Sequence, residues 1–272
     1  MVRPRDIKFH VAIPLSVISN EPGLLKKTIK LGIIARFLSI FRVDTLCIYL
    51  DPYGDIRDKD VVKTILDYLL TPPYLRKKIH PLTPLLRYAG MLPPLQIPSH
   101  GYSEDSSIRE GLIVDCRGDL AYVDVGLEDT IKVRVDRCRK GERLLVKAES
   151  KSEGSPVDRS EVYSGFSLRF FNSLKLLLSS YSNALRIATS KYGAPIASVI
   201  NNIVENARSQ GELLIVFGGP KQGIYELCEF EGIKPDSSFH YIVNTIPLQG
   251  VHTIRTEEAI AATLAILNMY IH

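Results

Sequence analysis

Three stretches of this chain combine residue types that could bind a small molecule or act on one. Arg36 lies in an otherwise apolar stretch, and an arginine buried there needs a partner for its charge. Residues 218–223 (Gly-Gly-Pro-Lys-Gln-Gly) follow an apolar run, and glycines at the end of a strand let backbone approach a ligand closely. Residues 244–256 form the third stretch, in which Pro247 and Gly250 interrupt regular structure. All three stretches are therefore candidate sites.

Each stretch also has an ordinary structural explanation. Arg36 could reach solvent or form an ion pair, and Gly-Gly-Pro could be a simple turn. Residues 244–256 could connect a strand to a helix, although such connections usually span about 2–6 residues. Its apolar residues predict that it packs against something that satisfies the loop amides; these are Ile246, Leu248, Val251 and Ile254. Residues 218–223 are not a P-loop and lack Gly-x-Gly-x-x-Gly, which disfavours a dinucleotide site.

The composition of the 272 residues is that of a soluble globular protein, with 45% hydrophobic and 24% charged residues. A formal net charge of +4 permits an anionic partner without requiring one. The four cysteines are scattered, so we expect no metal site, no disulfide framework, and reduced thiols in an intracellular, cytoplasmic protein. The first residues lack the apolar core of a signal peptide, and no apolar run reaches transmembrane length, so no membrane association is expected.

Two α/β regions flank a different kind of sequence. Alternating apolar runs and helical periodicity predict strands at 8–15, 43–50, 185–189, 213–217 and 241–243, and helices at about 20–41, 58–70, 170–179, 195–209 and 257–271. Strand–helix–strand order predicts parallel pairing, so we expect both regions to share one mostly parallel sheet. The fold class expected is therefore α/β.

The region between them predicts a small barrel that binds RNA. Residues 71–100 are rich in proline and basic residues, and residues 110–148 read as short strands separated by glycine-containing turns, as in an antiparallel OB-like barrel. Basic residues gather there and predict contacts to RNA phosphates, with Tyr122 as a stacking residue; the basic residues are Lys132, Arg134, Arg137, Arg139, Lys140 and Arg143. The alternative is that these charges only solvate one face.

Three motifs in the same order resemble those of the SPOUT (α/β-knot) RNA methyltransferases. Residues 32–44 around Arg36 resemble the first motif, residues 216–223 the second and residues 246–260 the third. The inserted barrel makes the chain similar to the archaeal and eukaryotic branch, whose eukaryotic members act on large-subunit ribosomal RNA. The resemblance implies residues 1–88 and 161–272 as the α/β-knot domain and residues 89–160 as the inserted OB-like domain.

The resemblance also implies a C-terminal trefoil knot that binds S-adenosylmethionine, and a homodimer in which the partner chain completes the site. Arg36 and Arg255 are the implied catalytic residues. Loop residues from three segments are the implied cofactor contacts: Thr189, Ser190, Phe217, Gly218, Gly219, Pro220, Gly223, Asn244, Ile246, Pro247, Leu248, Gln249, Gly250, Thr253 and Ile254. Gly250 is expected to permit the tight pass of the knotted loop.

Two departures from the family pattern bear on which atom is methylated. Ribose methyltransferases of the family carry Asn at the position of Lys30, and Ser-Leu-Asn where this chain has Thr253-Ile254-Arg255. Both departures favour methylation of a base, with uridine N3 as a candidate, over ribose 2′-O-methylation. Two other functions stay open on the residues alone: a non-catalytic RNA-binding protein of ribosome assembly, and a nucleotide-binding oxidoreductase.

Overall fold

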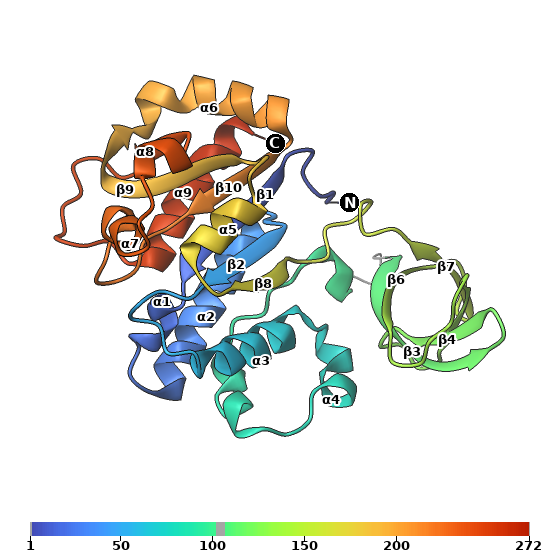
Figure 1. Ribbon diagram of the computed structural model, residues 1–272. Helices are drawn as coiled ribbons and strands as arrows, with labels where there is room; N and C mark the ends of the chain where they lie inside the picture. Colours follow the sequence, from blue (N-terminus) through green and yellow to red (C-terminus); the bar gives the residue numbers. More distant parts are fainter. Residues whose placement is uncertain (1, 102–106, 272) are drawn as a thin grey trace. The chain divides into compact units, whose positions relative to one another are not determined.

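The computed structural model describes residues 2–101 and 107–271 (Figure 1). Internal contacts divide them into two compact units. The sheet unit comprises residues 5–66, 87–93 and 166–271, and the barrel unit comprises residues 2–4, 67–86 and 94–165. The sequence predicts domain boundaries at residues 88/89 and 160/161. These boundaries refer to independently folding domains, which the division by contacts does not test, so they stay a prediction.

The sheet unit is built on a six-stranded sheet whose neighbouring strands are all parallel. Its strand order is β11-β9-β10-β1-β2-β8. The strands are β1 (Lys8–Pro14), β2 (Thr45–Tyr49), β8 (Ser167–Phe171), β9 (Leu185–Pro195), β10 (Glu212–Val216) and β11 (Tyr241–Asn244). Central strands of such a sheet are covered on both faces, which explains why β2 is buried at every residue. The expected parallel α/β sheet is confirmed.

Helices connect and cover these strands. They are α1 (Ser16–Ser19), α2 (Gly23–Ile40), α3 (Asp58–Leu70), α5 (Leu174–Ser180), α6 (Ile196–Gln210), α7 (Ile224–Phe230), α8 (Pro235–Ser238) and α9 (Thr256–Tyr270). Buried residues of α5 and α7 pack on one face of the sheet, in a core that includes Leu177, Leu227 and Val216. Helix α2 packs against α9, so the segments of the first and third motifs lie beside each other.

One predicted element is wrong in the sheet unit. Residues 170–179 were expected to be a single helix, but the chain forms the edge strand β8 and then α5. Phe170 and Phe171 favour a strand, and Ser173 caps the helix by accepting a hydrogen bond from the Leu176 amide at 3.1 Å. The helix periodicity after Ser173 concealed the strand before it.

The barrel unit contains a closed five-stranded barrel with the order β3-β4-β5-β7-β6. Its strands are β3 (Ile108–Arg117), β4 (Leu120–Asp124), β5 (Ile131–Arg134), β6 (Arg143–Ala148) and β7 (Glu153–Val157). Strands β5 and β7 pair in parallel and the other neighbours are antiparallel, which is a Greek-key arrangement as in OB folds rather than the fully antiparallel one expected. Short helices occupy the proline-rich segment: η1 (Pro73–Leu75), α4 (Arg76–Ile79), η2 (Pro84–Leu86), η3 (Ala89–Met91) and η4 (Pro98–His100).

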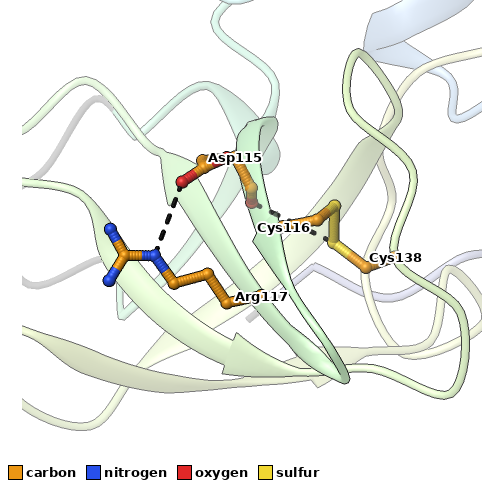
Figure 2. The surroundings of a disulfide bond; sticks show 4 residues. All are labelled: Asp115, Cys116, Arg117 and Cys138. Atoms are coloured by element: carbon orange, nitrogen blue, oxygen red, sulfur yellow. Dashed lines mark hydrogen bonds and ion pairs between the residues drawn. A yellow bond between two sulfur atoms is a disulfide. The ribbon is translucent and has the colours of Figure 1, made fainter.

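A disulfide in the barrel corrects the expectation that every cysteine is a free thiol. Cys116 near the end of β3 bonds to Cys138 in the segment after β5, with the two Cα atoms 5.9 Å apart (Figure 2). The two cysteines are 22 residues apart, which matches no sequence motif for a disulfide, and only the folding of the barrel brings them together. Cys47 and Cys228 are buried free thiols, as expected, and burial raises their pKa values to about 11 and about 12.

Among the helices formed by residues 2–101 and 107–271, none is both long and apolar enough to cross a membrane. The same residues contain no group of three or more His, Cys, Asp or Glu side chains placed to hold a metal ion.

Candidate active site

A pocket opens where the carboxyl ends of three adjacent parallel strands, β10, β9 and β11, meet. Its volume is about 350 Å³, within the range of small-molecule sites. Its walls are the segments 189–192, 217–223 and 243–256, which are the three segments that the sequence motifs predict to bind a cofactor. The structure places these predicted cofactor residues in the lining: Thr189, Ser190, Phe217, Gly218, Gly219, Pro220, Gly223, Asn244, Ile246, Gln249, Thr253 and Ile254.

Glycines let the three segments approach one another. A Cβ on Gly193 would lie 2.6 Å from the Ile242 carbonyl oxygen, and one on Gly218 would lie 3.0 Å from the Gly223 Cα. A Cβ on Gly219 would meet the Ser16 hydroxyl at 2.8 Å. Side chains do not fit at these points, so backbone forms the wall of the pocket at Gly218 and Gly219. A backbone wall offers amide and carbonyl groups to a polar ligand.

Gly250 does not have the role expected of it. A Cβ there would meet nothing within 4 Å, and the close pass of two backbone segments occurs at Gly193 instead. The loop also exposes part of its apolar surface: Leu248 is fully exposed with a positive φ of 57°, and Val251 is exposed. No residue that the structure describes covers these two side chains, so the expectation that the loop packs against something stays a prediction. Pro247, Leu248 and Gly250 lie outside the pocket lining, and their contacts to a cofactor stay a prediction.

Hydrogen bonds hold the second and third segments in place. The fully buried Tyr49 hydroxyl donates to the Phe217 carbonyl at 2.7 Å, and burial followed by the Asp51 charge raises the pKa of Tyr49. The Asn244 side chain donates to the Lys191 carbonyl at 3.0 Å and accepts from the Ile246 amide at 3.0 Å. The pocket is therefore supported from the strand ends beneath it.

The two predicted catalytic arginines lie outside this lining. Arg36 lies on α2, and Arg255 is exposed directly before α9, where its amide donates to the Glu258 carboxylate at 2.9 Å. Lys30 connects the two helices, since its Nζ lies 2.5 Å from Glu21 and 3.5 Å from Glu257. This nearly buried ion-pair group joins the helix of Arg36 to the first turn of the helix beside Arg255.

Five lining residues with reactive or recognition chemistry were not singled out from the sequence. They are Lys191, Tyr192, Lys221, Glu226 and His252. Lys191, Tyr192 and His252 lay within loops already assigned to the cofactor, but nothing in their spacing distinguished them. Glu226 lies in the first turn of α7, and only the folded loop turns it toward the pocket.

The predicted RNA-binding residues of the barrel fall into two groups. Arg137 and Lys140 are exposed, as are Lys132 and Arg134 on β5, where Lys132 pairs with Tyr122 of β4. The Arg117 guanidinium lies 5.0 Å from the Tyr122 ring. Surface carboxylates face Arg134 at 3.9 Å and Arg139 at 3.4 Å, and exposed pairs of this kind are weak enough to exchange for phosphate.

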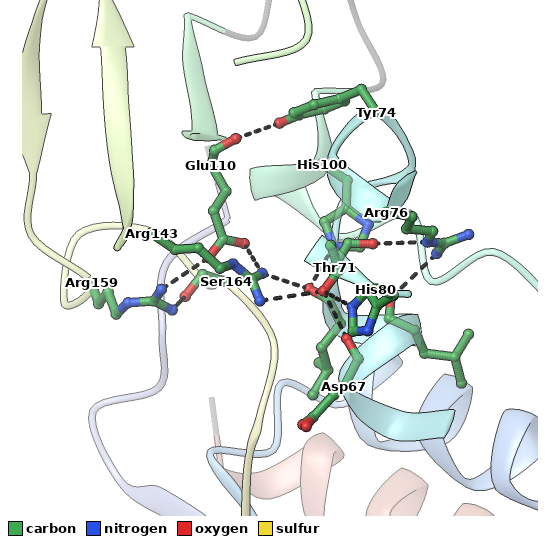
Figure 3. Close-up of polar contacts among 12 residues, drawn as sticks. Asp67, Thr71, Tyr74, Arg76, His80, His100, Glu110, Arg143, Arg159 and Ser164 are labelled. Atoms are coloured by element: carbon green, nitrogen blue, oxygen red, sulfur yellow. Dashed lines mark hydrogen bonds and ion pairs between the residues drawn. The ribbon is translucent and has the colours of Figure 1, made fainter. Parts of the chain in front are cut away.

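Arg143 belongs to a different arrangement, a polar cluster within the barrel unit (Figure 3). Its guanidinium lies 2.9 Å from the Glu110 carboxylate, which is 1% exposed and also receives Arg159 at 2.9 Å. Arg143 further donates to the Leu70 carbonyl at 3.1 Å. Burial lowers the pKa of the neighbouring His100 to about 4. Because Arg143 is engaged here, the RNA surface we propose below is built on Lys132 and Arg134, and RNA contacts of Arg137, Arg139 and Lys140 stay a prediction.

The family of the chain follows from its sequence profile. A protein family described as "Putative RNA methyltransferase" matches residues 8–267, which include both units and all three motif segments. This chain belongs to that family of RNA methyltransferases. The methyltransferase is therefore an enzyme that acts on RNA, and the resemblance to SPOUT enzymes is confirmed.

Relatives of the methyltransferase extend from archaea to animals. An uncharacterized protein of Haloarcula marismortui is 30% identical, with 95% of this chain and 98% of the relative covered. The 28S rRNA (uridine-N(3))-methyltransferase of Homo sapiens is 30% identical, with 97% of this chain and 79% of the relative covered. The Drosophila melanogaster protein of the same name is 30% identical, with 97% and 62% covered. Family membership removes the oxidoreductase alternative.

Proposed function

We propose that this enzyme transfers the methyl group of S-adenosylmethionine to N3 of a uridine in large-subunit ribosomal RNA. The observation that carries the proposal is the pocket, since the second and third motif segments converge on it together with residues 189–192, in a chain of an RNA methyltransferase family. The names of the human and fly relatives support the choice of atom and RNA. The departures at Lys30 and at Thr253-Ile254-Arg255 agree with a base rather than a ribose as the acceptor.

The pocket residues fit S-adenosylmethionine. Gly218 and Gly219 both line the pocket, so their backbone can lie against the flat adenine ring. The Glu226 carboxylate can pair with the ammonium group of the ligand, and Lys221 can pair with its carboxylate. Neutral, cationic and anionic groups of the ligand thus each have a matching group in the lining.

When bound, S-adenosylmethionine supplies an electrophilic methyl group whose carbon–sulfur bond breaks as the bond to N3 forms. The protein must remove the N3 proton, and His252 lines the pocket with an imidazole suited to general-base catalysis. Negative charge then spreads to the uracil carbonyl oxygens, where a guanidinium stabilises it. We assign this role to Arg36 and a phosphate- or acceptor-binding role to Arg255.

A homodimer would bring Arg36 to the pocket of the other chain. Arg36 does not line its own pocket, and α2 carries a row of partly or well exposed apolar side chains beside it; the row is Leu25, Ile29, Ile33, Phe37 and Ile40. These residues recur every three or four positions and so share one face of the helix. We propose that this face is buried against a second copy, which completes the site. We also propose that residues 244–256 form a trefoil knot.

The barrel would hold the RNA away from the reacting base. Lys132, Arg134 and Tyr122 present charge and a ring on neighbouring strands, which suits phosphate contacts and base stacking. We also propose that residues 89–160 fold as a separate OB-like domain. We further propose that the protein is located in the cytoplasm, alongside ribosomes.

The direct test is methyl transfer from labelled S-adenosylmethionine to unmodified large-subunit ribosomal RNA, followed by nucleoside analysis. Label in N3-methyluridine is the expected result. Label in a 2′-O-methylated nucleoside would contradict the assigned atom. Absence of label, with S-adenosylmethionine binding retained, would contradict the assigned RNA.

Arg36→Ala tests the assignment of the catalytic arginine. We expect it to keep its affinity for S-adenosylmethionine and to lose about 10²- to 10³-fold in transfer rate, the cost of removing one charge-stabilising donor. Arg57→Ala is the matched control, because Arg57 is an exposed arginine whose ion pair, with Asp55 at 2.6 Å, lies outside the pocket lining. An unchanged rate for Arg36→Ala contradicts its role.

A further inference from the structure

Tyr192 presents an aromatic ring at the pocket. It lines the pocket, yet its side chain is 71% exposed, whereas Phe217 in the same lining is 1% exposed. Lys191 lines the pocket beside it, with its Nζ 4.9 Å from the centre of the Tyr192 ring. A cation over one face of the ring leaves the opposite face available for a flat ligand.

The backbone that carries this ring is held on both sides. The Tyr192 amide donates to the Ser190 hydroxyl at 3.2 Å, and Asn244 donates to the Lys191 carbonyl at 3.0 Å. Immediately after Tyr192, Gly193 passes so close to β11 that a Cβ would lie 2.6 Å from the Ile242 carbonyl oxygen. The ring is therefore projected from a fixed backbone, which lowers the entropy lost when a ligand stacks on it.

Methylation of uridine N3 creates a need for such a ring. N3 carries the hydrogen that pairs with adenine, so the base must leave any helix before it can react. An extruded base loses its stacking neighbours, and RNA-binding proteins replace them with aromatic side chains. This step rests on the proposed function.

We infer that Tyr192 stacks on the extruded pyrimidine and that Lys191 neutralises a phosphate beside it. Tyr192 is then a substrate-positioning residue on the RNA side of the pocket, separate from the backbone walls that hold the methyl donor. Two other occupants would explain an exposed ring here: the methyl donor itself, or a second copy of the chain.

The absence of tryptophan from the chain gives a direct optical test. Tyr192→Trp introduces a single tryptophan, whose fluorescence a stacked base quenches. Phe230→Trp is the matched control, because Phe230 is 69% exposed on the same unit and does not line this pocket. Each protein is titrated with single-stranded oligouridylate and, separately, with S-adenosylmethionine.

The expected result is quenching of Trp at position 192, and not at position 230, by oligouridylate. Quenching at 192 by S-adenosylmethionine alone, with no further change on adding RNA, overturns the inference in favour of the methyl donor. Protection of position 192 from iodide in the RNA-free protein, lost on dilution to monomer, overturns it in favour of the second copy. No quenching by either ligand also overturns it.

Kinetics give a second readout that depends on transfer. Tyr192→Ala should raise the KM for RNA by about 5- to 150-fold, the range for loss of one base–aromatic contact, and Tyr192→Phe should restore it. The dissociation constant of S-adenosylmethionine should not change in either variant. If the wild-type protein transfers no methyl group while oligouridylate still quenches position 192, the proposed function fails and the stacking site stands.

Discussion

The pocket of the sheet unit and the polar cluster of the barrel unit use polar groups in opposite ways. The pocket is lined by exposed loops that include three glycines, and its charged side chains, such as Glu226, remain exposed. In the cluster, Glu110 is buried, and Arg143 and Arg159 both form ion pairs with it. Substitutions at the pocket should therefore change binding with little loss of stability, and substitutions in the cluster should do the reverse.

The largest effect expected is on stability, from Glu110→Ala. The variant removes the carboxylate that accepts from Arg143 and Arg159, which are 28% and 57% exposed, so the cost is about 1.5–3 kcal/mol, the range for a hydrogen bond to a charged group. The free energy of unfolding of the barrel unit should fall by that amount in hydrogen exchange. Glu142→Ala, which removes only an exposed pair with Arg139, should change it by less than about 1 kcal/mol. If Glu110→Ala weakens S-adenosylmethionine binding as strongly as it weakens the barrel, the cluster does not act on stability alone.

Acid should reveal a second feature of the same cluster. Burial lowers the pKa of His100 from 6.5 to about 4, so between these values the unfolded chain takes up a proton that the folded chain does not. Stability is therefore fully present above pH 6.5 and falls as the pH drops toward 4. The contribution of His100 is at most about 3 kcal/mol at 1.36 kcal/mol per pKa unit.

His100→Gln isolates this contribution, because His10 in the sheet unit has its pKa lowered to about 4 by burial as well. Denaturant titrations at pH 7 and pH 4.5 should show a smaller acid-induced loss of stability in His100→Gln than in the wild type. Equal losses in the two proteins would mean that His100 is not buried in its neutral form.

A smaller effect is expected beneath the pocket, from Tyr49→Phe. The variant removes the 2.7 Å hydrogen bond to the Phe217 carbonyl and keeps the packing of the ring. One hydrogen bond contributes about 0.5–1.5 kcal/mol, so S-adenosylmethionine should bind about 2- to 13-fold more weakly in calorimetry. Unchanged affinity would show that the loop does not depend on this support.

The smallest effect concerns the barrel surface. Lys132→Ala should weaken RNA binding a few-fold, equally for all RNA sequences, and reduce the slope of log affinity against log salt by about 0.7, as loss of one single-strand phosphate contact does. Arg143→Lys should leave that slope unchanged, because Arg143 faces Glu110. A smaller slope of log affinity against log salt in Arg143→Lys would show that Arg143 contacts an RNA phosphate.

Much of this architecture could be predicted from the sequence because its signals are local. Apolar strand runs, helix periodicity and the order of three motifs predicted the parallel sheet, the barrel and the pocket segments. The signals failed where tertiary contacts decide. Residues 170–179 contain an edge strand that pairs with β2, and Cys116 meets Cys138 only through the barrel.

The same limit applies to individual site residues. The sequence around Gly250 is typical of a loop, but two backbone segments approach each other closely at Gly193 instead. This approach follows from the pairing of β9 with β11. Arg143 is one of several similar basic residues in the sequence, and only the position of Glu110 on β3 separates it from them. No pattern of residue types encodes these pairings.

The central claim is that the pocket at the ends of β9, β10 and β11 holds the methyl donor. Gly223→Val tests it most directly, because Gly223 lines the pocket with an extended backbone that any residue can adopt, and a Cβ added there meets only the flexible Glu226 carboxylate. Gly90→Val is the control, since a Cβ there meets nothing within 4 Å.

Calorimetric titration of S-adenosylmethionine into the three proteins is the measurement. One site per chain in the wild type and in Gly90→Val, with about tenfold or greater weakening in Gly223→Val, is the result predicted. No binding to the wild type at millimolar S-adenosylmethionine, or equal affinity in all three proteins, would contradict the claim.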